Sequence, residues 1–456
     1  MTFHSVLFPK PDVRWQPERP DPPDYFVDLH LDRVIDAITA RWATYNLKPY
    51  FFAGPLDADT IRYRQAIMKD LECGAVLDAI RLFARAMHLM RNHLEQAERL
   101  YYRYQKKRWF LDAVHIYCTG IGRLRQDLDD VDLESRGLLD FRDFLRRYIE
   151  SESFTALLAD TKAVLQALSA LHYSLVIKDF RVQVQLYDGE DDYSAEIEKT
   201  FAKFQQYAVE DYRFEFANAG QSNHVQEAIL ERLARLHPGV FAALDRYYKG
   251  HGMFLDETIT AFDREIHFYM ACLDYLSKLQ QAGLPFCYPE MTNETKEIYS
   301  HDGFDLGLAD KLVSLGVPVV CNDFYLKGRE RIFVVTGPNQ GGKTTFARAF
   351  GQMHYLAGIG CPVPGRKARL FLFDQIFTHF EKEENITDLQ GHLADELIRI
   401  RSILDKAAPN SIVILNETFN STTLKDATSL SKKVIGELIE RDSLGVFVTF
   451  IDELTV

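Results

Sequence analysis

The sequence predicts a multidomain chain, in which a mostly helical body with a small β insertion is followed by an α/β domain. Three changes of pattern support this fold class. Apolar residues recur at helical spacing over about 29–171. From Tyr173 the pattern switches to period two, as in VQVQL at 182–186, which is typical of a strand. Beyond Gly283 short apolar runs alternate with helical segments, as in a parallel α/β sheet.

The domain boundaries follow from these changes. Prolines gather in residues 1–30, which we interpret as an extended leader. The helical body has a first part at 31–172 and a return at 219–290, with a β-containing insertion at 173–218 between them. Residues 291–456 form the predicted α/β domain. The sequence ends soon after its last predicted strand, so we expect a domain that is truncated at its C-terminus or lacks dimerising elements.

Composition indicates a globular chain with a large core. Of the 456 residues, 47% are hydrophobic and 26% are charged. The net charge of −13 argues against non-specific coating of nucleic acid, although local basic patches remain compatible with it. Six scattered cysteines without a CxxC pair predict reduced thiols. With neither a signal-peptide pattern nor an apolar run of about 18 residues, the chain is predicted to be cytoplasmic and to have no membrane partner.

The most informative stretch is RIFVVTGPNQGGKTTF at 331–346. Its β-branched run at 332–335 predicts a buried strand, and helical spacing begins at Phe346. Between them, the eight residues from Gly337 to Thr344 fit the pattern G-x-x-x-x-G-K-[ST]. A strand, a glycine loop and a helix in this order form the setting in which that pattern binds phosphates.

The residue types of the loop suit phosphate chemistry. Glycines let backbone N–H groups approach phosphate oxygens, and the helix N-terminus adds unsatisfied donors. Lys343 is placed to reach the β- and γ-phosphates, and the Thr344 hydroxyl to bind Mg²⁺. ATP and Mg²⁺ are therefore the predicted cofactors. The predicted nucleotide contacts are Gly337, Pro338, Asn339, Gln340, Gly341, Gly342, Lys343, Thr344 and Thr345. The alternative is a glycine-rich turn that binds nothing.

A second apolar strand, at 411–415, ends in the polar pair Asn416 and Glu417. P-loop ATPases place acidic side chains at the carboxyl end of a neighbouring strand, and Glu417 is the candidate to orient the attacking water. Asn416 stands where an aspartate is usual. Because its amide adds no negative charge to hold Mg²⁺, we expect slow turnover. The predicted catalytic residues are thus Glu417 and Lys343, and the predicted metal ligands are Thr344 and Asn416. The alternative is a buried strand that ends in a turn.

These motifs resemble those of the MutS mismatch-repair ATPases. The loop TGPNQGGKTTF is similar to that family's TGPNMGGKST, and further family motifs resemble the stretches at 55–65, 360–368, 374–378, 416–423 and 447–454. The resemblance implies an ABC-type ATPase domain joined to a lever-and-clamp body, with the 173–218 insertion as a DNA-contacting clamp. It also implies a homodimer in which each glycine loop faces the partner's 388–392 segment. ATP binding and hydrolysis would then move the levers on duplex or branched DNA during repair or recombination.

The chain departs from the family pattern at several positions. Nothing in it resembles the mismatch-recognition and connector domains. Gly391 replaces a serine that would contact the partner's γ-phosphate, and His392 is a further candidate donor. Phe450 replaces the switch histidine and cannot sense phosphate. Phe324 and Tyr325 lie near the place where the family stacks adenine, and either stacking or simple packing fits them.

Two other functions also fit the sequence. The first is a nucleotide-gated DNA clamp or scaffold with negligible hydrolysis, which Asn416 and Phe450 favour. The second is a P-loop kinase of a small metabolite, against which the long helical body argues. Residues 101–109 interleave aromatic with basic side chains. They could contact a phosphate backbone, or they could be a solvated helix face whose tyrosines pack inward.

Overall fold

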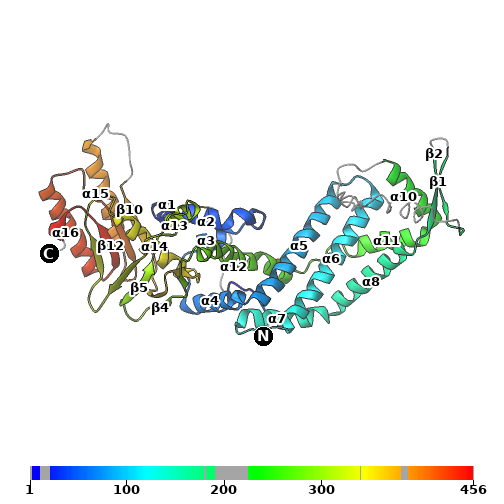
Figure 1. The fold of residues 1–456 in the computed structure, drawn as a ribbon, viewed down its shortest axis with the longest axis horizontal. Coiled ribbons are helices and arrows are strands. Elements are labelled where there is room, and N and C mark those ends of the chain that lie inside the picture. The colour runs from blue at the N-terminus through cyan, green and yellow to red at the C-terminus, as the bar shows by residue number, and fades with distance from the viewer. Residues whose placement is uncertain are drawn as a thin grey trace. The chain divides into compact units, whose positions relative to one another are not determined.

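The computed structural model describes residues 3–10, 21–178, 181–189, 224–338, 340–381 and 389–454. The chain divides into two compact units. The helical unit comprises Gly74–Asp132 and Arg142–Asp256, and the α/β unit comprises Met1–Cys73, Leu133–Phe141 and Glu257–Val456. The predicted fold class is confirmed, because a mostly helical region with a small β element precedes a mixed α/β domain (Figure 1).

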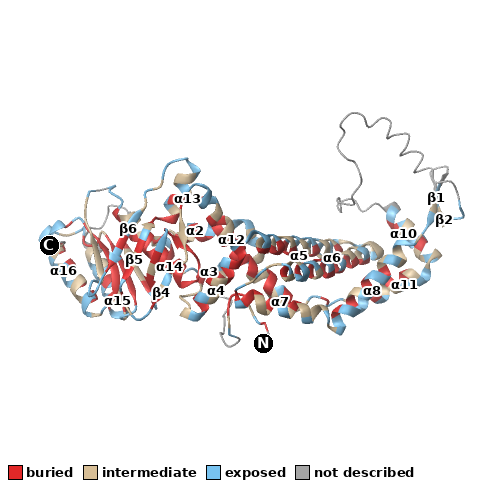
Figure 2. Ribbon diagram, turned by 60° about the horizontal axis from the view of Figure 1, so that its bottom comes forward, coloured by how far each residue is buried: buried red, intermediate tan, exposed pale blue. Residues whose placement is uncertain are grey.

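Long helices dominate the helical unit. α5 and α6 pack against each other along their lengths, with their apolar side chains buried between them (Figure 2). The helices are α5 (Gly74–Arg99), α6 (Arg103–Asp129), α7 (Arg136–Ile149, which begins in the α/β unit), α8 (Glu152–Ser169), α10 (His224–Leu236) and α11 (Pro238–Gly250). The period-two stretch forms an antiparallel hairpin of β1 (Tyr173–Lys178) and β2 (Arg181–Leu186). The remainder of the predicted insertion, at 190–218, lies outside the described residues.

The α/β unit contains helices from both ends of the chain. They are α1 (Tyr25–Asp28), α2 (Leu31–Thr39), the 3₁₀ helix η1 (Ala40–Tyr45), α3 (Lys48–Phe52), α4 (Ala58–Glu72) and α12 (Glu257–Gln281). Asp57 caps α4, because its Oδ1 accepts hydrogen bonds from the backbone N–H groups of Asp59 and Thr60. The leader at 1–30 was expected to be extended, but its residues 25–28 form the short helix α1.

The α/β domain has a parallel sheet with the order β10-β11-β12-β7. Its strands are β10 (Ile376–Phe380), β11 (Ile412–Asn416), β12 (Leu444–Val448) and β7 (Ile332–Val335). Two expectations were wrong. β7 is a half-buried strand at the end of the sheet, not a fully buried one. β11 is not its neighbour, because β12 pairs with both and separates them.

Helices cover both faces of this sheet. α14 (Lys343–Gly358) packs closely on one face, where a Cβ added at Gly351 would lie 2.8 Å from the Ile414 Cδ1 atom. α15 (Leu389–Lys406) and α16 (Leu424–Glu440) lie on the other face (Figure 1), where they share a core with Val413, Leu415 and Phe447. The alternating residues of β11 thus point to opposite faces, as strand geometry requires.

A second sheet, with the order β4-β9-β5-β6, was not predicted. Its strands are β4 (Glu290–Thr292), β9 (Lys367–Phe371), β5 (Ile298–Gly303) and β6 (Asn322–Leu326). This sheet is mixed, because β4 pairs parallel with β9 whereas β5 pairs antiparallel with both β6 and β9. The remaining elements are the short pair β3 (Phe286–Cys287) and β8 (Val363–Pro364), the helix α13 (Leu306–Ser314) and the 3₁₀ helix η2 (Asp452–Leu454).

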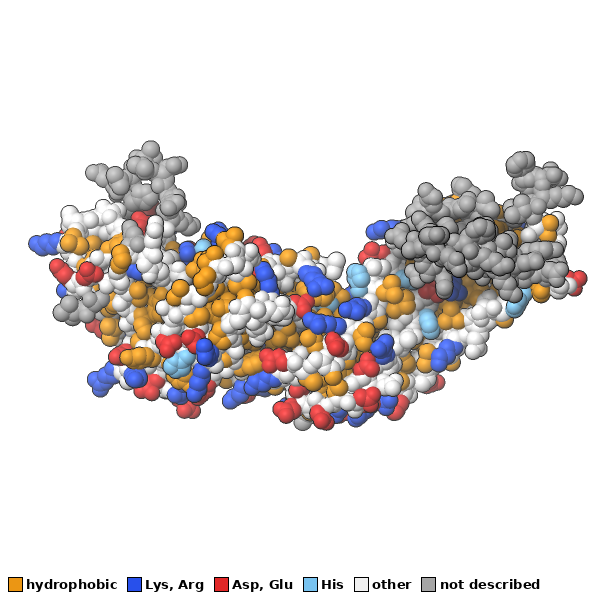
Figure 3. Space-filling model, viewed as in Figure 1, with side chains coloured by type: hydrophobic (Ala, Val, Ile, Leu, Met, Phe, Trp, Pro, Cys, Tyr) orange, Lys and Arg blue, Asp and Glu red, His pale blue; other side chains and the backbone are white. Residues whose placement is uncertain are grey.

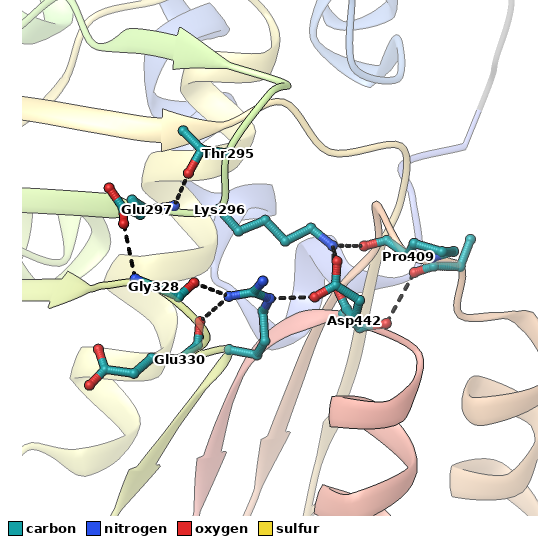
Figure 4. A network of polar contacts seen from close by, with 10 residues as sticks. Thr295, Lys296, Glu297, Gly328, Glu330, Pro409 and Asp442 are labelled. Atoms are coloured by element: carbon teal, nitrogen blue, oxygen red, sulfur yellow. Dashed lines mark hydrogen bonds and ion pairs between the residues drawn. The ribbon is translucent and has the colours of Figure 1, made fainter.

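A polar network ties the two sheets together (Figure 4). The buried Lys296, between β4 and β5, donates to the Pro409 carbonyl at 2.6 Å and to Asp442 Oδ2 at 2.7 Å. Arg331 donates to Asp442 Oδ1 from the residue before β7. Although burial opposes it, hydrogen bonds from Lys296 and Arg331 hold the pKa of Asp442 below its ordinary value. Arg331 precedes β7, Pro409 precedes β11 and Asp442 precedes β12. The network therefore lies at the amino ends of these parallel strands.

None of the helices in the described parts of the chain combines the length and the apolar character that crossing a membrane requires.

Candidate nucleotide site

The glycine loop joins β7 to α14 at the carboxyl edge of the parallel sheet (Figure 1). Gly337 and Gly342 have φ angles of 139° and 84°, in the region that favours glycine. Gly342 is also the N-cap of α14, and it offers no side chain to the first-turn N–H groups. These donors are therefore left to water or to an anionic ligand, which the positive end of the helix dipole also favours.

Lys343 lies folded back on its own loop. Its Nζ donates to the carbonyl of Gly337 at 2.7 Å and to that of Pro338 at 3.1 Å. The Phe450 ring lies over the same ammonium, with 4.2 Å between Nζ and the ring centre. The lysine is buried, so its charge is held by two carbonyl dipoles and one aromatic face.

Thr344 and Asn416 meet across the sheet edge. Thr344 Oγ1 donates to Asn416 Oδ1 at 3.0 Å, which joins the first turn of α14 to the end of β11. Both predicted metal ligands thus present oxygen atoms at one place, and oxygen is the ligand type that Mg²⁺ prefers. The residues fit the ion by ligand type, but the pair carries no negative charge.

Glu417 follows β11 in an unusual backbone conformation. Its φ is 57°, and its N–H donates to the carbonyl of Val448 at the end of β12. Phe419, two residues later, also has a positive φ of 64° and is fully buried. The predicted water-orienting residue therefore sits on a left-handed turn at the same edge of the sheet as the glycine loop.

The other predicted residues are placed as follows. Asn339 and Asp388 lie outside the described residues, as does the side chain of His392, and the backbone of Gly391 lies in α15. Gln340 has a φ of 64° and forms part of the turn before α14. Gly341 donates its N–H to the Pro338 carbonyl at 3.2 Å. Thr345 lines a pocket beside α14.

That pocket adjoins the first turns of α14. It is lined by Gly303, Phe304, Asp305, Val320, Asn322, Phe324, Thr345, Phe346, Ala349, Phe350 and Met353. Phe324 is buried and packs against Phe333, Phe346 and Phe350, whereas Tyr325 is exposed and has Lys327 over its ring. The sequence allows two interpretations of Phe324, stacking on adenine and simple packing, and in the structure Phe324 packs against other aromatic side chains.

Sequence reasoning missed two supports of the site. Glu396 on α15 accepts a hydrogen bond from the Phe419 N–H, and nothing distinguishes it from the other charged residues of that helix in the sequence. Arg348 on α14 donates to the Asp28 carbonyl, and Thr378 on β10 donates to the Asp28 carboxylate. Burial lowers the pKa of Arg348. The α1 segment therefore braces both α14 and β10.

Comparison with known proteins agrees with this geometry. The family model described as MutS domain V matches residues 333–456. DNA mismatch repair protein MutS of Thermotoga maritima is 31% identical over 230 residues, which cover 50% of this chain and 27% of that protein. MutS of Methanosarcina acetivorans is 29% identical over 231 residues, 49% of this chain and 24% of that protein. MutS of Syntrophomonas wolfei is 35% identical over 138 residues, 30% of this chain and 16% of that protein.

The chain spans about a quarter or less of the length of these relatives. The match to domain V begins within β7 and takes in the glycine loop, β11 with its polar pair, and β12. The chain therefore has a C-terminal domain that matches MutS domain V, and it is similar to MutS proteins over half of its length.

Proposed function

We propose that this chain is an ATP-dependent DNA-binding protein of the MutS type, which binds ATP at the glycine loop and hydrolyses it slowly. The observation that carries this proposal is the contact of Thr344 with Asn416 beside an uncapped helix N-terminus. It unites a phosphate-binding loop with a set of hard oxygen ligands. The relatives named as DNA mismatch repair proteins support a role in DNA repair.

Hydrolysis would proceed by in-line attack of water on the γ-phosphate, with cleavage of its bond to the bridging oxygen. The N–H groups of the first turn of α14 and the Lys343 ammonium would bind the phosphate oxygens. Glu417 would accept a hydrogen bond from the attacking water and orient it. Thr344, with Asn416, would hold Mg²⁺, which neutralises phosphate charge when it is bound. Because Asn416 is neutral, retention of the ion would be weak and turnover slow.

The proposal includes a homodimer. Two α/β domains would close on two ATP molecules, each glycine loop facing the partner's 388–392 segment. The free energy of this closure would be available to change the grip of the helical units on DNA. This part rests on the resemblance to the family and on the position of the loop at an open edge of the sheet.

DNA contact is proposed for the 173–218 insertion. In its hairpin, Lys178 and Arg181 lie opposite each other in register. The basic stretch at 101–109 is a poorer candidate, because Arg103 and Lys107 both pair with Asp245. On the face drawn in Figure 3, acidic and basic side chains are interspersed over the described residues, so we expect the DNA-binding surface to be local.

The DNA part is tested by reversing charge in the hairpin. Lys178→Glu combined with Arg181→Glu should lower affinity for duplex DNA by roughly tenfold and flatten its salt dependence. Arg246→Glu with Lys249→Glu, at exposed positions of α11, makes the same change in charge as a control. Unchanged binding in the hairpin variant would remove this claim.

A second candidate is a nucleotide-gated clamp that binds ATP and barely hydrolyses it. The engagement of Lys343 by its own loop and the neutral Asn416 favour it. Steady-state ATPase rates, with and without duplex and branched DNA, discriminate the two. If Glu417→Gln lowers the rate, the protein is an ATPase. If the wild-type rate is negligible and the substitution leaves it unchanged, the clamp without hydrolysis is correct.

A further inference from the structure

A carboxylate from α15 reaches the turn that carries Glu417. Glu396 Oε1 accepts a hydrogen bond from the Phe419 N–H at 2.9 Å and lies 3.3 Å from His379 Nε2 on β10. Both side chains are largely buried, with 14% of Glu396 and 11% of His379 exposed. The carboxylate therefore sits between β10 and the turn after β11, within the framework of the site.

This turn needs external support. Glu417 and Phe419 both adopt positive φ angles, which residues with a Cβ rarely do. Such conformations persist only where the surroundings hold them. On one side the Glu417 N–H binds the Val448 carbonyl, and on the other the Phe419 N–H binds Glu396. The backbone on either side of the Glu417 side chain is thus held by β12 and by α15.

We propose that Glu396 is a positioning residue for Glu417, so that its carboxylate sets the backbone from which Glu417 orients the attacking water. The inference rests on the proposed hydrolytic function. A hydrogen bond from a backbone N–H to a charged oxygen is stronger than one between neutral groups, which suits a strained turn. Glu396 acts through the backbone, by its hydrogen bond with the Phe419 N–H.

The position of Glu396 along α15 adds a second consequence. The helix begins at Leu389, within the 388–392 segment proposed to face the partner's nucleotide. Glu396 lies about two helical turns further along the same helix. A shift of α15 on dimer closure would therefore move Glu396 relative to the Phe419 N–H, and so change the turn that carries Glu417.

The test compares substitutions at Glu396 with a matched change nearby. Glu396→Ala should lower kcat by about tenfold or more, because small misplacements of a catalytic group are costly, while ATP affinity measured by calorimetry stays within about twofold. Glu396→Gln keeps an acceptor oxygen and should restore most of the rate. Asp395→Ala removes the same charge from an exposed position on the same helix, and it should leave the rate unchanged.

Each outcome decides one question. Suppose that Glu417→Gln abolishes ATP hydrolysis in the same assay. The inference is then overturned if Glu396→Ala hydrolyses ATP at the wild-type rate, or if its rate falls no more than that of Asp395→Ala. Equal losses in Glu396→Gln and Glu396→Ala also overturn it. An unchanged rate in Glu417→Gln overturns the proposed hydrolytic function and this inference with it. If Glu396→Ala does not fold, Glu396→Asp takes its place, since it keeps the charge on a shorter side chain; full activity in that variant overturns the inference.

Discussion

The Lys343 ammonium lies 4.2 Å from the centre of the Phe450 ring. Phe450 follows the carboxyl end of β12, whereas Asp442 precedes its amino end. Phe450 stands where the resemblance to the family expects a histidine. An aromatic face attracts a cation, but it cannot donate a hydrogen bond to phosphate. In the structure, this contact holds Lys343 while its N–H groups bind carbonyls of its own loop.

Removal of the Phe450 ring should strengthen ATP binding. In Phe450→Leu the folded-back position of Lys343 loses about 0.5–1 kcal/mol, so ATP should bind roughly two- to fivefold more tightly. Phe450→Tyr retains an aromatic face and should behave like the wild type. Titration calorimetry with Mg²⁺ and ATP measures the difference. Weaker binding in the leucine variant would show that the ring supports the bound state instead.

A carboxylate at position 416 should improve metal binding. Asn416→Asp places a negative charge where Thr344 Oγ1 now donates to an amide oxygen. We expect about tenfold less Mg²⁺ to be needed for half-maximal ATP hydrolysis, together with a higher rate. Asn416→Ala removes the oxygen and serves as the comparison. An Mg²⁺ requirement that is the same in all three proteins would contradict the assignment of this residue.

The Asp442 network should stabilise the fold without affecting nucleotide binding. Asp442→Asn keeps a residue that tolerates its φ of 59° but leaves the buried Lys296 without a carboxylate. Since Asp442 is itself half exposed, we expect a loss of about 2 kcal/mol in unfolding free energy at neutral pH. Glu440→Ala, an exposed change of equal charge, should cost less than about 0.5 kcal/mol. Denaturant unfolding measures the loss of stability, and calorimetry with ATP shows whether nucleotide binding is unchanged. Weaker ATP binding in Asp442→Asn would contradict the claim that the network does not affect the nucleotide site.

His354 should make the α/β unit sensitive to acid. Burial lowers its pKa to about 4 from 6.5, while its Nδ1 lies 2.9 Å from the Phe350 carbonyl. In the unfolded chain the His354 imidazole binds a proton below about pH 6.5, whereas in the folded chain it does so only below about pH 4. The free energy of unfolding therefore falls as the pH falls from 6.5 to 4.

The expected loss from this one group is about 2 kcal/mol between pH 7.5 and pH 5. In His354→Asn, which retains a donor for the Phe350 carbonyl, that share of the pH dependence should disappear. Urea unfolding at the two pH values measures it. Identical pH dependence in the variant and the wild type would show that His354 does not control it.

The local parts of the site could be predicted from sequence. A glycine loop between a β-branched run and a helical pattern has few alternatives, because the residue types themselves restrict the backbone. The same holds for the period-two pattern at 182–186, which lies in the strand Arg181–Leu186. Their signals lie within a few residues of the structure that they specify.

The parts that sequence did not reveal depend on distant segments. That β12 separates β11 from β7 is decided by tertiary packing, to which the close approach of Gly445 to the Val413 carbonyl contributes. The bond from Phe419 to Glu396 joins a turn to a helix earlier in the chain, and no spacing rule connects them. The mixed second sheet likewise brings together strands on both sides of the glycine loop in sequence.

The central claim is that the phosphates of ATP bind at the loop closed by Lys343. Titration calorimetry of the full chain with ATP and Mg²⁺ tests it most directly, with Lys343→Ala as the matched variant and thermal unfolding to show that the variant is folded. We predict saturable heat with the wild type and none with the folded variant. The account is contradicted if the wild type gives no heat, or if the folded variant binds ATP as tightly as the wild type does.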